Sequence, residues 1–297
     1  LVDQFNWRYV MYAPAPVTLL GVWMAWRFLP LPRSRPANYP FDFLGLALLG
    51  SLIALTLDTL TRLQELTGQA IRVLVQGMVA VALLAAFLVR ARTARYPLIK
   101  LDLLRRPVFL FATLGAMALG LALFGSTYLI PLFVQTTLGF SATEAGLPML
   151  PAGIVLGMTF PLAGRLADRR SARSLVSVGI VVFALSAVLF AVTGHLVGFG
   201  WLAFWAILGR VGIGFMLPAL STGAMNPLPP ELMGAGSSTI NFARQLGGAL
   251  GVNIVALTIE FGEHQGGLPT FSAFQSAWWL VAVFVAVAAI PVWKMRS

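Results

Sequence analysis

Long uninterrupted runs of apolar residues constrain this chain more than any other feature of its sequence. Runs of spanning length occur at about 8–29, 42–61, 71–90, 107–137, 143–163, 175–194, 200–222, 237–261 and 273–293. As a helix, each is long enough to cross a hydrocarbon core about 30 Å thick, and a helix satisfies its own backbone polar groups there. The run at 107–137 is overlong, so we expect it to tilt or to end near Thr136. The sequence predicts an all-α integral membrane protein with about nine transmembrane helices.

The composition excludes most soluble classes of protein. Hydrophobic residues make up 59% of the 297 positions and charged residues only 10%, whereas a soluble domain carries about 25% charged residues. The net charge of +10 does not indicate nucleic-acid binding, because the basic residues are spread over short loops rather than gathered on one folded face. The chain has no cysteine and two histidines, both in predicted loops. We therefore expect no metal site and no cofactor.

The basic residues also predict the orientation of the helices. If nine spans alternate, fifteen basic residues fall on the side reached after the first helix, three fall on the other side, and Arg210 and Arg244 lie within helices. Such an excess in short loops marks the cytoplasmic side of a membrane protein. We expect a cytoplasmic C-terminus and an extracytoplasmic N-terminal end. The chain starts at Leu1 without the features of a signal peptide, so it has the character of a fragment of a longer protein.

The loop from Gly164 to Arg173 reads Gly-Arg-Leu-Ala-Asp-Arg-Arg-Ser-Ala-Arg. Gly164 at the helix end would let a neighbouring helix approach closely. Asp168 would cap the next helix or pair with an arginine across the loop, which gives a latch that opens and closes. On residue types alone, an ordinary basic turn is the preferred interpretation of the loop.

Polar residues within the predicted spans are the remaining candidates for function. An arginine at the centre of a span must face protein or water, so Arg210 is either a pathway or coupling residue or a structural arginine bonded to neighbouring helices. Arg244 is placed to snorkel towards the basic side. Asn241 and Gln245 share one helical face, where they line a cavity or bond another helix.

Small residues predict close helix packing. Gly247, Gly251 and Ala243 form a ridge of small side chains on one helix, a pattern typical of helix contacts in membranes. A proton-coupled transporter also needs a carboxylate that titrates in a partly dehydrated site. The in-span candidates are Asp58, Glu144 and Glu260, and all three lie near helix ends. Interfacial carboxylates that stay in water are therefore the preferred interpretation.

Several motifs in order along the chain carry a family resemblance. Besides the Gly164–Arg173 loop, they are Asp3-x-Phe5-x-Trp7-Arg8-Tyr9, Asp42-Phe43-Leu44-Gly45, Pro97-Leu98, Leu208-Gly209-Arg210-Val211-Gly212-Ile213-Gly214, Leu228-Pro229-Pro230-Glu231-x-x-Gly234 and Asn241-x-x-Arg244-Gln245-Leu246-Gly247-Gly248-Ala249-Leu250-Gly251. Together they resemble the fourteen-helix drug:proton antiporter branch of the major facilitator superfamily, over about its sixth to fourteenth helices. The chain departs from the branch at Pro14-Ala15-Pro16, and nothing in it corresponds to helices one to five.

The resemblance implies a division of the chain and a set of site residues. Residues 1–40 would hold the last helix of the N-terminal lobe, 41–106 two linker helices and a cytoplasmic loop, and 107–297 a complete six-helix C-terminal lobe. The implied substrate and coupling pathway is formed by Arg210, Tyr128, Gln135, Asn241, Arg244 and Gln245. The implied cytoplasmic gate is Gly164, Asp168, Arg169 and Arg173, and the implied packing glycines are Gly214, Gly247, Gly248 and Gly251.

The function implied by the resemblance is proton-coupled export of hydrophobic small molecules across a bacterial inner membrane by alternating access. The expected partners are the lipid bilayer, such a substrate, protons, and either a missing N-terminal half or an efflux adaptor protein. The alternatives are a truncated membrane subunit that does not transport and a permease of the same superfamily for another small metabolite. An enzyme is not expected, because no credible catalytic pair appears in the sequence.

Overall fold

The computed structural model describes residues 12, 14–28, 40–63, 70–167, 169–193, 198–265 and 270–293, and over these residues the chain is helical without any strand. Eight segments of this described part are long and apolar enough to cross a membrane. They are Phe43–Arg62, Ala70–Thr93, Pro107–Thr136, Ala142–Ala167, Ala172–Thr193, Phe199–Met225, Pro230–Glu263 and Thr270–Val287. These are the last eight of the nine predicted spans, which confirms the all-α membrane fold.

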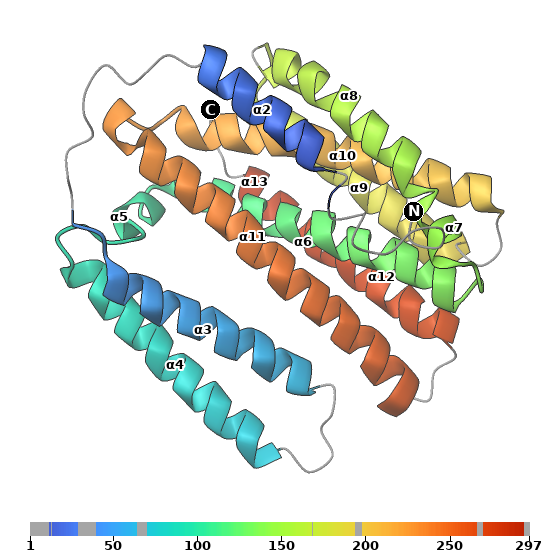
Figure 1. Cartoon of the computed structure of the whole chain (residues 1–297), viewed down its shortest axis with the longest axis horizontal. Helices are drawn as coiled ribbons and strands as arrows, with labels where there is room; N and C mark the ends of the chain where they lie inside the picture. The colour runs from blue at the N-terminus through green and yellow to red at the C-terminus, as the bar shows by residue number, and fades with distance from the viewer. Residues whose placement is uncertain are drawn as a thin grey trace.

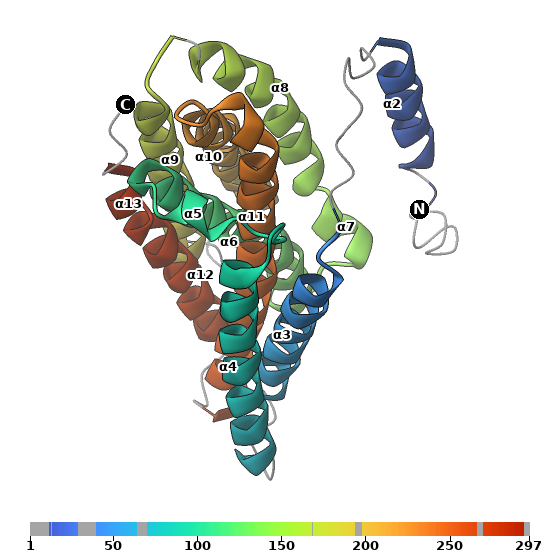
Figure 2. The same ribbon diagram turned by 90° about the vertical axis from the view of Figure 1, so that its left-hand side faces the viewer.

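The first predicted span is described only in part. Its described core is α2 (Ala15–Phe28), with 14 residues and no buried side chain, and most of residues 1–13 and 29–39 lie outside the described ranges. In Figure 2, α2 stands apart from the other helices.

Helix boundaries depart from the apolar runs where proline interrupts or begins a helix. The run at 143–163 forms α7 (Ala142–Gly146) and α8 (Met149–Ala167), and Pro148 in the break has no N–H with which to continue the helix. The last run divides into α12 (Thr270–Val287) and α13 (Ala289–Trp293) just before Pro291. Helix α11 (Pro230–Glu260) begins seven residues before the predicted 237. Pro230 suits the first helical position, but the residues that follow it are too polar to belong to an apolar run.

Helices α6 (Pro107–Thr136), α9 (Ala172–Thr193), α10 (Phe199–Met225), α11 and α12 form the main bundle, with α8 against α10 (Figure 1). The α6 helix ends at Thr136, as predicted. Large aromatic side chains fill the core, where the rings of Phe190 and Trp278 stack with centroids 4.5 Å apart. Half of the residues in the membrane-spanning stretch of α6 are buried inside the protein. The bundle therefore has a packed interior of its own.

Helices α3 (Phe43–Arg62) and α4 (Ala70–Thr93) form a hairpin beside this bundle (Figure 2), and α3 packs on α11. Only 6% of the residues in the membrane-spanning stretch of each helix are buried, so most of their apolar surface faces outward. The start of α3 is tied to the end of α4, because buried Asp42 accepts hydrogen bonds from the Gly45 N–H at 3.0 Å and from Arg90 Nε at 2.9 Å. Burial raises the pKa of Asp42, but these donors outweigh it and hold that pKa below its ordinary value.

Candidate functional site

Helices α6 and α11 touch backbone to backbone through glycine. A Cβ added to Gly120 on α6 would overlap the carbonyl oxygen of Arg244, and a Cβ added to Gly247 on α11 would overlap the carbonyl oxygen of Met117. Only residues without side chains allow backbones this close. The contact places the outward faces of the two helices side by side as one continuous wall.

The remaining packing glycines also lie at tight contacts. A Cβ would overlap the Phe124 ring at Gly248, and it would lie 2.8 Å from Leu121 Cα at Gly251 and 2.6 Å from Thr159 Cγ2 at Gly214. Gly214 thus brings α10 against α8, whereas the other two belong to the contact between α11 and α6. The ridge of small residues on α11 continues at Ala243, which is 7% exposed.

Arg210 lies at the middle of α10 with only 6% of its surface exposed. Its Nη2 donates to Thr127 Oγ1 at 2.8 Å and its Nη1 to the Leu123 carbonyl oxygen at 3.5 Å, both on α6. The ion pairs of the described residues do not include one between Arg210 and a carboxylate. The guanidinium therefore ties α10 to α6, in the manner of a structural arginine, and a role in coupling stays a prediction.

Asn241 and Arg244 open onto a groove of about 290 Å³ between α6, α10 and α11. Arg244 Nη2 donates to Asn241 Oδ1 one turn away on the same helix, which holds both side chains at the wall. Three serines join them along the groove, at positions 221, 237 and 238. The groove combines hydroxyl, amide and guanidinium groups with apolar side chains, a lining that suits an amphipathic small molecule.

The other three candidates on α6 and α11 lie further along the same wall. Gln245 is exposed beside Phe124 in a second, shallower depression of about 250 Å³ between α6 and α11. Tyr128 and Gln135 are exposed on α6, and Gln135 Nε2 donates to the Pro131 carbonyl of its own helix. The structure thus gathers Asn241, Arg244 and Gln245 on α11, and it separates Arg210 from them as a buried residue.

The gate loop is described in part, because Asp168 lies outside the described residues. Arg169 is exposed, and the Arg173 guanidinium lies 5.0 Å from the centre of the Trp293 ring on α13, a cation–π distance. The close helix approach expected at Gly164 is wrong for the described part of the chain, where a Cβ at this position would meet no atom within 4 Å. The latch between Asp168 and an arginine stays a prediction.

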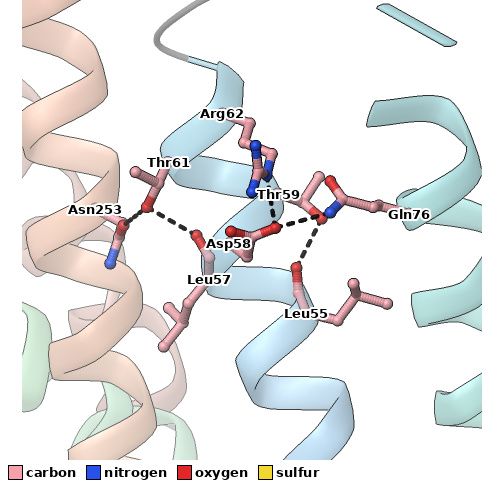
Figure 3. A network of polar contacts seen from close by, with 8 residues as sticks. All are labelled: Leu55, Leu57, Asp58, Thr59, Thr61, Arg62, Gln76 and Asn253. Carbon is pink, nitrogen blue, oxygen red and sulfur yellow. Dashed lines mark hydrogen bonds and ion pairs between the residues drawn. The ribbon is translucent and has the colours of Figure 1, made fainter. Parts of the chain in front are cut away.

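The candidate carboxylates lie near the ends of helices. Glu144 forms a capping box with Ser141 at the start of α7, which is a structural role, and Glu260 is the last residue of α11. Asp58 accepts hydrogen bonds from Arg62 Nε and Gln76 Nε2, each at 2.7 Å, and so links α3 to α4 (Figure 3). None of these three lies at the centre of a described span.

Sequence reasoning missed the polar contacts that tie the hairpin together and to the bundle. The spacing of Asp58 and Arg62 at i,i+4 was a visible signal of their ion pair. The hydrogen bond from Thr61 on α3 to Asn253 on α11, at 3.2 Å (Figure 3), had no such signal, since the two residues lie 192 positions apart.

Comparison with known proteins gives the context for this geometry. The model of the Major Facilitator Superfamily matches residues 1–252. The "Multidrug resistance protein B homolog" of Mycobacterium tuberculosis is 30% identical over 273 residues, which cover 89% of this chain and 50% of that protein. The "Multidrug export protein EmrB" of Escherichia coli is 30% identical over 260 residues, covering 85% and 50%.

A third relative, the "Lincomycin resistance protein LmrB" of Listeria monocytogenes, is 26% identical over 265 residues, covering 89% of this chain and 56% of that protein. The chain thus spans about half the length of the curated relatives that it matches. The names of all three relatives refer to resistance or export.

Proposed function

The chain belongs to the major facilitator superfamily, and from this premise we propose that it forms the C-terminal portion of a proton-coupled multidrug exporter of the inner membrane. The observation that carries the proposal is its similarity, over 85–89% of its length, to relatives named for multidrug export and resistance. Such an exporter binds its substrate between two lobes near the middle of the membrane and exposes the site to each side in turn.

The wall of α6 and α11 is the part of this chain that we assign to the substrate pathway. It presents Asn241 and Arg244 in the mixed polar and apolar groove and Gln245 in the second depression, and Tyr128 and Gln135 extend it along α6. A few polar groups among apolar side chains hold hydrophobic molecules of varied shape without strict geometry. In this assignment residues 107–297 form the C-terminal lobe, 41–106 the linker helices, and 1–40 the last helix of the other lobe.

We infer that the basic ends of the helices face the cytoplasm, as the excess of arginine and lysine on one side supports. The C-terminus is then cytoplasmic, and the loop with Gly164, Asp168, Arg169 and Arg173 forms a gate on that side. Protons are the coupling ion in this proposal. The carboxylate that carries them belongs to the other lobe, because the described carboxylates discussed above are held at helix ends.

The proposal is tested by efflux of a fluorescent lipophilic cation from vesicles that contain the full-length protein to which the chain belongs. Efflux is expected to need a proton gradient and to stop with a protonophore, and the 297-residue chain alone is expected to give none. Asn241→Ala combined with Gln245→Ala should slow efflux. Asn253→Ala on the same helix, which faces α3, serves as the matched control. Efflux that ignores the proton gradient, or efflux by the chain alone, would refute the proposal.

A further inference from the structure

An apolar groove of about 400 Å³ lies between the α3–α4 hairpin and the bundle. Its walls come from α3, α4, α6 and α11, and the short α5 (Leu101–Leu104) closes one end. The hydroxyls of Thr56, Thr113 and Thr239 in its lining all donate to carbonyls of their own helices. The groove therefore offers almost purely apolar surface, which suits a hydrocarbon chain.

A basic pocket of about 890 Å³ adjoins this groove where α4 ends and α6 begins, around α5 at the left of Figure 1. Leu88, Leu101 and Leu104 line both spaces. The charged residues of the pocket are five cations and one carboxylate, namely Arg92, Arg95, Lys100, Arg105, Arg106 and Asp102. The pocket thus carries an excess of positive charge beside the mouth of the apolar groove.

Neighbouring groups do little to neutralise these cations. Arg105 Nη1 lies 3.3 Å from Asp102 Oδ1, but both side chains are more than 80% exposed, so water screens this pair. Arg106 donates to the Pro227 carbonyl at 3.4 Å, and the Arg95 guanidinium lies over the Tyr96 ring. The positive potential of the pocket is therefore available to an anion.

We propose that an anionic phospholipid binds here as a structural ligand, with its phosphate headgroup in the basic pocket and an acyl chain in the groove. The pocket adjoins the ends of the spanning segments Ala70–Thr93 and Pro107–Thr136, which is the depth of lipid headgroups. Basic pockets between transmembrane helices recognise anionic headgroups by this charge complementarity. The bound lipid joins the hairpin to the lobe along a boundary that otherwise has few buried residues.

The combination of the two spaces decides between ligand classes. A soluble anion would use the cations but leave the adjoining groove without an occupant. A zwitterionic lipid would fill the groove but gain little from an excess of positive charge. A cationic drug would be repelled from the pocket. An anionic phospholipid satisfies both spaces, and the inference stands whether or not the chain exports drugs.

The headgroup is tested by native mass spectrometry of the purified chain with phosphatidylglycerol, with phosphatidylcholine and with inorganic phosphate. Phosphatidylglycerol should be retained over phosphatidylcholine. Arg95→Gln combined with Lys100→Gln should weaken its binding about 25-fold, since each cation near an anionic lipid contributes roughly a factor of five. Arg27→Gln combined with Arg72→Gln removes the same charge outside the pocket and should leave binding unchanged.

The acyl chain is tested at Leu88, which lines both spaces. Leu88→Trp should fill the mouth of the groove and reduce lipid retention at least tenfold. Val89→Trp, at the next position on α4 and 62% exposed, should have no effect. Circular dichroism and gel filtration establish that each variant is folded.

Three results would overturn the proposal. The first is equal retention of the two lipids, and the second is equal loss of binding in the test and control variants. The third is displacement of the lipid by inorganic phosphate while Leu88→Trp leaves lipid retention unchanged, which would indicate a simple anion site. A small diazirine-bearing amino acid at position 56, in the lining of the groove, tests the occupant in native membranes and leaves the cations of the basic pocket in place. Capture of lipid supports the proposal, and capture of protein contradicts it.

Discussion

The backbone contact between α6 and α11 leads to a prediction of opposite sign for two glycines on one helix. At Gly247 an added Cβ would overlap the Met117 carbonyl oxygen, whereas at Gly234 it would meet no atom within 4 Å. We therefore expect Gly247→Ala to destabilise the protein and Gly234→Ala to stabilise it. The same methyl group is added to α11 in both variants.

The magnitude follows from the surroundings of each glycine. Overpacking costs about 1–3 kcal/mol, and the upper end applies at Gly247 because the obstacle is the backbone of α6 rather than a flexible side chain. Alanine improves helix propensity by roughly 1 kcal/mol over glycine, which leaves Gly247→Ala less stable by about 2 kcal/mol. Gly234→Ala keeps the propensity gain, so the two variants should differ by about 3 kcal/mol.

Thermal unfolding of the two variants in one detergent measures this difference. A loss of about 2 kcal/mol corresponds to a fall in Tm on the order of 5 °C, and Gly234→Ala should unfold at or above the Tm of the unmodified chain. If Gly247→Ala unfolds at the same temperature as Gly234→Ala or higher, the helices are not in backbone contact, and the wall that we assign to the pathway is not built as described.

Three further predictions concern polar groups of the bundle, the hairpin and the gate. Thr127→Val removes the 2.8 Å partner of Arg210 and should cost about 1–3 kcal/mol of stability. Thr136→Val, whose hydroxyl donates to the Leu132 carbonyl of its own helix, should cost less, and chemical denaturation measures both. Because the pKa of Asp42 is lowered on folding, its ionised form stabilises the protein above the unfolded value of about 3.8, and this contribution is lost as pH falls through the folded pKa. The difference in Tm between the unmodified chain and Asp42→Asn should therefore shrink from pH 6 to pH 3, and a constant difference would exclude the charged interaction. Asp168→Asn in the full-length protein should slow efflux while expression stays normal, and unchanged efflux would remove the latch.

The spans were predictable because hydropathy reports burial in lipid directly. The structure describes eight of them, and these eight follow the apolar runs. Boundaries were predicted less well where polar or proline residues belong to helices. Pro230 and Glu231 begin α11, although the predicted span began only at 237, and Pro148 divides a run that hydropathy treats as continuous. Single residues such as a proline at a helix start decide these boundaries, and hydropathy averaged over many residues hides their effect.

The arrangement of the site was less accessible from the sequence. The position of Arg210 inside a span predicted that it faces protein or water rather than lipid, but its bonds to Thr127 and Leu123 depend on how α10 packs against α6. The small-residue ridge through Gly247 predicted close packing without naming α6 as the partner helix. Contacts between residues far apart in sequence, such as Thr61 with Asn253, leave no periodic signal in a single sequence.

The central claim is that the outward wall of α6 and α11 lines a water-accessible substrate pathway. The chain has no cysteine, so single cysteines introduced into it can be read once any cysteine in the rest of the full-length protein has been replaced by serine. The control positions lie on exposed surfaces of different kinds. Ser171 lies in the loop between α8 and α9, and Ser276 lies on α12, where we expect it to face lipid.

The measurement is maleimide labelling of Gln245→Cys in the full-length protein in membranes, with and without a saturating lipophilic cation. We predict that Gln245→Cys is labelled and that the cation protects it, that Ser171→Cys is labelled with or without the cation, and that Ser276→Cys is not labelled. If Gln245→Cys behaves like Ser276→Cys, or is labelled equally with and without the cation, then the wall of α6 and α11 is not the substrate pathway.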